Sequence, residues 1–177
     1  MRQIQTVLLF LLAIGLLEGC GIARRSMRPP SRTVSSGTSS STSQKPVAEM
    51  QVSSLNEAQA TLMQAYRDWK GTPYKLGGAS KKGVDCSELV NIIFSQYFGI
   101  NLPSNTHEQL NAGKGIRRAA IHTGDLVFFR TGRKTLHVGI MLNRGEFLHA
   151  STSSGVRISK FGKSYWRNRF LAARRIF

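Results

Sequence analysis

The chain has 177 residues and a formal net charge of +16, because 25 lysines and arginines face only nine aspartates and glutamates. Its two cysteines leave no disulfide framework, and its globular part of about 125 residues suffices for one domain with its own core. Such a charge usually suggests nucleic acid, but the export signal described next argues against that partner. It favours an anionic cell-wall polymer or a membrane surface.

The N-terminus has the pattern of an export signal. A positively charged start precedes an apolar run over residues 7–17, which is too short to span a membrane. The run ends in the letters LEGC, which resemble a bacterial lipobox, so we predict a signal peptide over residues 1–19 and a lipid on Cys20. Glu18 departs from the small or apolar residue usual at its position. Cleavage near Gly19 without lipidation, or an uncleaved anchor, is therefore the alternative.

Residues 20–51 are predicted to form a flexible basic linker that is rich in serine and threonine. They include three prolines and a Ser/Thr/Gly run, and they have almost nothing to bury. Four arginines in this stretch either contact anionic lipid headgroups or only keep the tether soluble. Because Gly21 rather than aspartate follows Cys20, we expect anchoring in an outer membrane, facing the periplasm.

The domain is predicted to cover residues 52–177, and the pattern in its first part predicts helices. Ser54 and Glu57 form a capping-box pattern, and apolar residues at helical spacing follow until Gly71. A second helix is predicted from Cys86 to Phe98, with Asp85 as its cap and Gly99 at its end. Ser104 and Asn105 can cap a short third helix that ends near Gly113.

The second part of the domain is predicted to be β-rich, with a hairpin turn at residues 143–145. The expected strands cover residues 125–130, 137–143, 146–151, 156–159 and 170–176. Helices followed by strands indicate an α+β fold in which the helices pack on an antiparallel sheet.

Cys86 is the only cysteine of the domain, and it opens the second helix. A helix N-terminus offers free N–H groups and a partial positive charge, which favour the reactive thiolate. The alternative is that Cys86 is a small buried hydrophobe.

A thiol nucleophile needs a base and a partner that orients the base. His137 and His149 lie on the two strands of the predicted hairpin, which places them opposite or diagonal to each other, about 5 Å apart at Cβ when opposite. The helix that carries Cys86 must pack on this sheet, which can bring its N-terminus to His137.

The order of a helix-borne cysteine, a strand-borne histidine and a polar third residue is the papain-type arrangement. More narrowly, the chain resembles the NlpC family of cell-wall cysteine peptidases from about Leu55 to Phe177. The residues that carry the resemblance are Gly71-Thr72-Pro73-Tyr74, Gly77-Gly78, Asp85-Cys86-Ser87, Leu102-Pro103, Thr106, Gln109, Gly124 to Phe129, His137 to Ile140, and His149-Ala150-Ser151.

The resemblance implies a papain-like α+β domain with N-terminal helices on a mostly antiparallel sheet of five or six strands. It implies that Cys86 is the nucleophile, His137 the general base, His149 the residue that orients it, and Tyr74 a group near the oxyanion. The implied reaction is hydrolysis of a stem or cross-link peptide bond in peptidoglycan. We expect no metal, no cofactor and no nucleic acid. The sequence leaves the oligomeric state open and favours a monomer.

Two residues beside the predicted nucleophile are candidates for substrate contact. Glu88 stands where the family usually has glycine, and its charge could oppose thiolate formation or crowd the substrate. Ser87 either lines the cleft or serves the first turn of the helix. If Glu88 blocks turnover, the protein is a wall-binding lipoprotein without activity. An acyltransferase on the same scaffold is a third reading, which the order of Cys86 before His137 disfavours.

Overall fold

The computed structural model describes residues 47–177, with side chains from residue 54 onward. The predicted signal peptide, Cys20 and most of the predicted linker therefore lie outside the described residues. In chain order the elements are α1 (Val47–Trp69), β1 (Ala79–Ser80), β2 (Gly83–Val84), α2 (Cys86–Phe98), α3 (Thr106–Gln109), β3 (Lys114–Ile116), η1 (Arg118–Ala120), β4 (Leu126–Arg130), β5 (Leu136–Asn143), β6 (Glu146–Ser151), β7 (Gly155–Lys160), α4 (Ser164–Arg167) and β8 (Phe170–Arg175).

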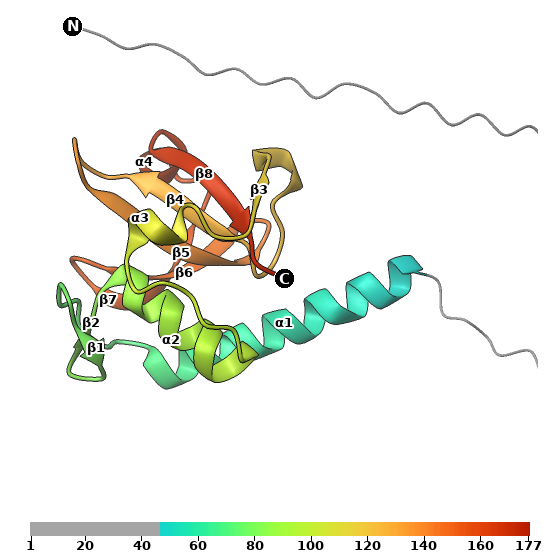
Figure 1. Ribbon diagram of the computed structural model, residues 1–177, viewed down its shortest axis with the longest axis horizontal. Helices are drawn as coiled ribbons and strands as arrows, with labels where there is room; N and C mark the ends of the chain where they lie inside the picture. Colours follow the sequence, from blue (N-terminus) through green and yellow to red (C-terminus); the bar gives the residue numbers. More distant parts are fainter. Residues whose placement is uncertain (1–46) are drawn as a thin grey trace, which may run out of the picture. The chain divides into compact units, whose positions relative to one another are not determined.

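A six-stranded sheet in the order β3-β8-β4-β5-β6-β7 organises the domain, and each neighbouring pair of strands is antiparallel. Helices α1 and α2 cover one face of this sheet (Figure 1). On the other face, Trp166 of α4 and Arg118 of η1 contact the aromatic side chains. The predicted α+β fold is confirmed. The five predicted strands are present, and β3 is the edge strand that the sequence pattern missed because its residues are short of apolar side chains.

The sheet is buried on both faces, which gives the domain two apolar clusters. Leu126 and Phe128 of β4 point into the larger cluster beneath the helices. Val127 and Phe129 point into a smaller, aromatic cluster on the opposite face. Because successive side chains of a strand alternate between faces, a strand buried on both sides reads as an unbroken apolar run.

The first helix begins earlier than the sequence pattern indicated. It starts at Val47, so Ser54 lies inside α1 and the predicted capping box at this position is wrong. Residues 47–53 contain neither glycine nor proline, and most of them are good helix formers, so nothing in the chain stops the helix at Ser54. The last five residues of the predicted linker, 47–51, belong to this helix.

The other two predicted helices differ in accuracy. Helix α2 has the predicted bounds, and Gly99 ends it with a left-handed backbone at φ 68°. Helix α3 is capped by Asn105, whose side chain accepts a hydrogen bond from the N–H of Glu108 at 2.9 Å. It ends at Gln109, earlier than predicted, and tight turns lead from there to β3. Within the described residues, no helix is both long and apolar enough for a membrane span.

Candidate active site

The start of α2 is fixed by the carboxylate of Asp85. One of its oxygens accepts hydrogen bonds from the N–H of Glu88 at 2.8 Å and from the hydroxyl of Ser87 at 2.9 Å. The other oxygen accepts from the N–H of Gly77 at 2.9 Å. Asp85 is therefore the predicted helix cap, and it also ties the glycine loop to the helix that carries Cys86.

Cys86 is buried at the first position of α2, with 6% of its surface exposed. Its Sγ lies 3.9 Å from the hydroxyl oxygen of Thr106 on α3. Backbone hydrogen bonds from Val138 and Ser87 also reach the sulfur. The contact with Val138 places the thiol beside β5, one residue from His137.

Burial decides the protonation state of the thiol. Removal from water raises the pKa of Cys86 and outweighs the hydrogen bonds from Val138 and Thr106, which lower it. The carboxylate of Asp85 raises the pKa further. Desolvation therefore opposes the expectation that the helix N-terminus favours the thiolate of Cys86.

His137 and His149 are brought together as the hairpin register predicted. Strands β5 and β6 pair Ile140 with Leu148, so the two histidines lie diagonally across the ladder. Nε2 of His137 is 2.8 Å from Nδ1 of His149. Gly139 lies between them on β5, where a Cβ would come within 2.6 Å of the Phe147 ring and 3.2 Å of the His149 Cβ. A side chain at this position would clash with the Phe147 ring and with the Leu148 carbonyl oxygen, at 2.8 Å, on the strand that carries His149.

A third residue, Ser159, completes the polar chain and was missed by the sequence pattern. Its hydroxyl oxygen lies 2.9 Å from Nε2 of His149. Burial lowers the pKa of His137 to about 4 and that of His149 to about 3, so both rings are neutral at neutral pH. If His149 donates to Ser159, its Nδ1 accepts from Nε2–H of His137. His137 then keeps a free lone pair on Nδ1, which is the form that a general base needs.

Trp166 of α4 holds the two imidazoles from the far side of the sheet. Its ring stacks on His137, with centroids 5.4 Å apart and an angle of 25° between planes. It meets His149 edge-on at 5.1 Å. Trp166 is half-buried, packs against the smaller apolar cluster and lines a pocket beside His137. Its contact with the histidines comes from the tertiary structure alone.

A pocket of about 180 Å³ opens beside His137. Its lining residues are Thr131, His137, Ser151, Thr152, Ser153, Tyr165 and Trp166. A larger cavity of about 460 Å³ lies elsewhere, lined by Ser54, Leu55, His122, Arg175 and Phe177. The smaller pocket is the candidate substrate site, because it contains the imidazole that can move a proton.

Tyr74 lies on the loop before α2 and forms a parallel bridge with Val84. Burial raises the pKa of its hydroxyl, and the charges of Cys86 and Asp85 raise it further. The hydroxyl of Tyr74 therefore stays protonated. A negative charge on Cys86 interacts electrostatically with it. This placement suits a hydrogen-bond donor to an oxyanion, the role predicted for Tyr74.

The two tentative substrate-contact residues have different surroundings. The hydroxyl of Ser87 is buried and donates to Asp85, which favours the helix-turn interpretation over the cleft. Glu88 is half-buried, and its carboxylate accepts a long hydrogen bond of 3.4 Å from Asn91 on the next turn. The carboxylate that raises the pKa of Cys86 is that of Asp85.

Gln109 explains why the short helix α3 is part of the site. Its buried amide nitrogen donates to the carbonyl of Ser87 at 2.9 Å and to that of Pro103 at 2.7 Å. These bonds hold α3, with Thr106, against the start of α2.

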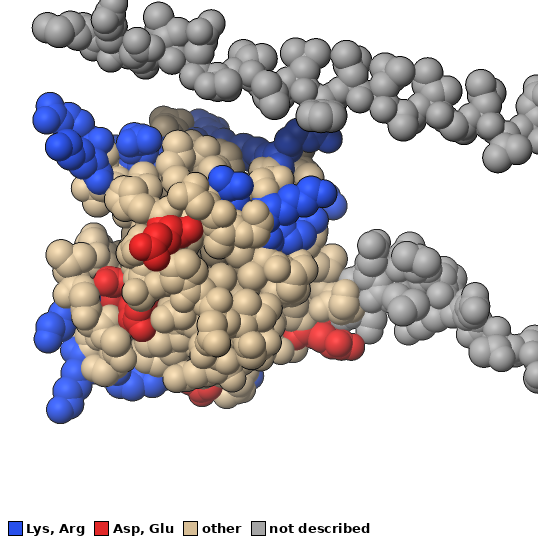
Figure 2. All heavy atoms as spheres, viewed as in Figure 1, with Lys and Arg blue, Asp and Glu red and all other residues tan. Residues whose placement is uncertain are grey.

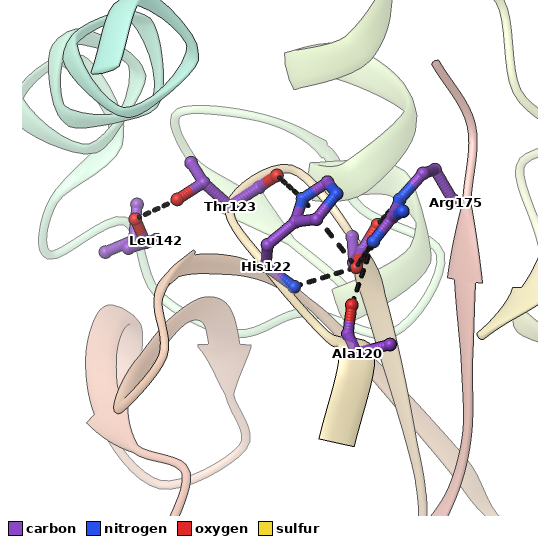
Figure 3. Close-up of polar contacts among 6 residues, drawn as sticks. Ala120, His122, Thr123, Leu142 and Arg175 are labelled. Carbon is purple, nitrogen blue, oxygen red and sulfur yellow. Dashed lines mark hydrogen bonds and ion pairs between the residues drawn. The ribbon is translucent and has the colours of Figure 1, made fainter. Parts of the chain in front are cut away.

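A second polar cluster lies at the opposite end of β5, around the buried carboxylate of Asp125. Arg175 donates to both of its oxygens at 2.8 Å, and the N–H of His122 donates at 2.9 Å. Figure 3 shows this cluster with its other members labelled. The ion pair joins the start of β4 to the end of β8. No group of three or more His, Cys, Asp or Glu side chains among the described residues could hold a metal ion.

Residues 71–175 match the model of the NlpC/P60 family, which covers more than half of the chain. The chain belongs to the NlpC/P60 family.

Curated relatives in this family are close in sequence. The chain is 43% identical over 163 residues to the protein of Escherichia coli K12 named murein DD-endopeptidase MepS/murein LD-carboxypeptidase, covering 91% of this chain and 86% of that protein. It is 48% identical over 119 residues to a probable endopeptidase of Haemophilus influenzae, covering 66% of this chain and 74% of the relative.

Solved structures of NlpC/P60 proteins have the same fold. The peptidoglycan hydrolase RipB of Mycobacterium tuberculosis superposes with a TM-score of 0.58 at 28% identity, covering 71% of this chain and 67% of that one. A protein of Staphylococcus aureus described as similar to a lipoprotein of the NLP/P60 family gives 0.62 at 30% identity. That match covers 69% of this chain but only 42% of the other.

Proposed function

We propose that this NlpC/P60 protein is a peptidoglycan endopeptidase that uses Cys86 as its nucleophile. The observation that carries the proposal is the continuous chain of polar contacts from Ser159 through His149 to His137, with the thiol of Cys86 held against the backbone of the next residue, Val138. A buried nucleophile, a base with one free nitrogen and an orienting partner are the elements of thiol catalysis.

The reaction begins from a neutral thiol and a neutral imidazole. When the substrate carbonyl approaches, the proton of Cys86 moves to Nδ1 of His137 while the sulfur forms a bond to the carbonyl carbon. The carbonyl π electrons move to oxygen, where the Tyr74 hydroxyl and the N–H of Cys86 can donate to the developing charge. The intermediate collapses, the C–N bond breaks, and His137 returns the proton to the leaving amine.

Water then releases the acyl-enzyme. His137 takes a proton from the water, the resulting hydroxide attacks the thioester carbonyl, and the C–S bond breaks. The thiolate regains its proton from His137, which restores the resting pair. Throughout the cycle His149 accepts from Nε2–H of His137, so the imidazolium that forms transiently is stabilised and kept in its orientation.

The bond that we propose is the cross-link between two stem peptides, because a relative that is 43% identical over most of its length is named a murein DD-endopeptidase. The same relative is also named a murein LD-carboxypeptidase, so trimming of a stem is a second product to look for.

Mass spectrometry of defined muropeptides tests the function and the bond together. The wild-type protein should convert a cross-linked dimer into monomers, and Cys86→Ser should leave the dimer intact. Thr106→Ser is the matched control, because it keeps a hydroxyl beside the sulfur and should retain most of the activity. Equal persistence of the dimer with wild type and Cys86→Ser would overturn the proposal.

We also propose that Cys20 carries the lipid and anchors the enzyme in the outer membrane. This part is supported by the LEGC letters after the apolar run and by Gly21. The intact mass of the mature protein from a Gram-negative host should show added acyl chains. Cys20→Ala should lose that mass and leave the membrane fraction. A mature wild-type protein that lacks acyl mass contradicts the anchor and leaves the peptidase proposal untouched.

A further inference from the structure

The excess positive charge of the domain belongs to one half of it. Residues 54–109, which build the helices and the glycine loop, contain five lysines and arginines and five aspartates and glutamates. Residues 110–177, which build the sheet, contain fourteen lysines and arginines but only two aspartates and glutamates. In the view of Figure 2 the acidic side chains lie mainly over the helical part, and the larger blue clusters border the part formed by the sheet.

Part of this charge surrounds the candidate substrate pocket. We name as the cationic rim five basic side chains at the pocket end of the sheet: the exposed Arg130, Arg133, Lys134 and Arg157, and the half-buried Arg169. Three of them lie on either side of the lining residue Thr131, at the end of β4 and in the turn to β5. Arg169 stacks over Tyr165, another lining residue, with 4.0 Å between its guanidinium carbon and the ring centroid.

Arg157, the remaining residue of the rim, interacts electrostatically with His149. Arg157 on β7 is the ladder partner of His149, and its charge contributes to lowering the pKa of that imidazole. Among the described residues, none of the five rim cations lies within 4 Å of a carboxylate, whereas Arg175 at the far end of the sheet is paired with Asp125. Unpaired cations gathered at the pocket end of the sheet repel each other, and an anionic ligand would relieve that repulsion.

The first turns of α2 and α3, beside the thiol, carry charge of the other sign. Glu88 follows Cys86 by two residues on α2, and Glu108 follows Thr106 by two residues on α3. Thr106 itself contacts the sulfur of Cys86. A carboxylate on a bound peptide is therefore repelled by Glu88 and Glu108 and attracted by the cationic rim, which gives an acidic peptide a preferred orientation.

We propose that the cationic rim binds the free carboxylates of the peptidoglycan stem peptide and so selects acidic stems and orients them for attack by Cys86. This inference rests on the proposed function. A membrane surface is the other anion that a basic patch can fit, but a bilayer seated on the rim would cover the mouth of the pocket that the rim surrounds. The substrate polymer is therefore the occupant that the arrangement favours.

A pair of charge-matched variants tests the rim. Arg130→Gln/Arg133→Gln/Lys134→Gln removes three charges beside the pocket. Lys114→Gln/Arg144→Gln/Lys160→Gln removes three exposed charges at the opposite end of the same sheet. Each full-length protein is assayed on a cross-linked muropeptide dimer with free carboxylates and on the same dimer with those carboxylates amidated.

We expect the rim variant to raise KM for the carboxylate substrate roughly 5- to 20-fold, with kcat nearly unchanged and with little effect on the amidated substrate. The far-end variant should behave as wild type on both. The rise in KM should shrink as salt is added. If wild type cleaves both dimers but the rim and far-end variants share one KM, the rim proposal is overturned and the endopeptidase stands.

Vesicles distinguish the other source of anions. Binding of the three proteins to vesicles of phosphatidylglycerol is compared with binding to purified sacculi. Loss of vesicle binding by the rim variant, with sacculus binding and KM unchanged, would assign the rim to a membrane and overturn the proposal. A wild-type protein that cleaves neither dimer would instead refute the proposed function.

Discussion

Two buried polar clusters lie at opposite ends of strand β5. One is a pair of neutral rings and the other is an ion pair. His137 and His149 are buried as neutral rings that share one hydrogen bond of 2.8 Å. Asp125 is buried as a partner of the Arg175 guanidinium, which donates to both carboxylate oxygens. The first pair can accept a proton and release it again. The second is an ion pair in which both carboxylate oxygens accept hydrogen bonds from the guanidinium.

The size of the neighbouring cavity does not distinguish the two clusters. The larger cavity, of about 460 Å³, includes Arg175, and the smaller one, of about 180 Å³, includes His137. Arg175 already donates hydrogen bonds to Asp125 and to the carbonyl of Ala120. His137 keeps a free nitrogen. A free lone pair near a thiol indicates chemistry, whereas a satisfied ion pair indicates structure.

Removal of the base tests most directly whether the histidine cluster is catalytic. His137→Ala should lower the rate of muropeptide cleavage by about 10²- to 10⁴-fold, because no other described group is placed to take the proton from Cys86. His107→Ala is the matched control, since His107 is exposed on α3. Liquid chromatography of the products measures both rates. Equal rates for the two variants would show that the imidazole pair has no catalytic role.

Removal of the Asp125 charge should lower the stability of the fold. Asp125→Asn leaves Arg175 without its carboxylate and should lower the free energy of unfolding by about 3 kcal/mol. Urea denaturation followed by tryptophan fluorescence measures the loss. Asp68→Asn, which alters an exposed carboxylate, should cost clearly less. If Asp125→Asn unfolds at the wild-type urea concentration, the cluster does not hold β4 to β8.

Acid should destabilise the domain through the histidine pair. In the unfolded chain each imidazole binds a proton near pH 6.5, but burial keeps His137 neutral down to about pH 4 and His149 down to about pH 3. The unfolded state therefore binds more protons in this window, and stability falls as the pH drops from 6.5 towards 4. The slope is up to about 1.4 kcal/mol per pH unit for each histidine.

Denaturation curves at several pH values check this slope. His149→Gln removes one of the two groups and should flatten the dependence by about half. A wild-type profile without loss of stability between pH 6.5 and 4 would show that the rings are already protonated in the folded protein.

The smallest expected effect concerns the tryptophan behind the base. Trp166→Ala exposes His137 to water, so its pKa rises towards the ordinary value and the acid limb of the rate profile moves to higher pH. The value of kcat/KM should fall roughly 10- to 100-fold because the ring is less well held. Trp166→Phe should keep most of the stacking and the original limb. Tyr165→Ala, which alters the pocket beside Trp166, should change KM without moving the limb.

Local features of this fold could be predicted from the sequence. Helix α2 has its predicted bounds because Asp85 and Gly99 cap it within a few residues of its ends. The β5–β6 hairpin has its predicted register because a short turn fixes which residues face each other. The start of α1 at Val47 was missed because no local residue marks it. Strand β3 was missed because only one of its three residues, Ile116, is apolar.

The sequence by itself determined which groups this protein has for chemistry and the order in which they occur: a thiol at a helix start, then two histidines on paired strands. Only the tertiary structure decided their states. It buried Cys86 so that its pKa rises, placed Trp166 and Ser159 around the imidazoles, and made Asp85 rather than Glu88 the carboxylate that acts on the thiol. Hydrogen bonds within a turn or cap depend on neighbouring residues, whereas desolvation depends on segments that are distant in the chain.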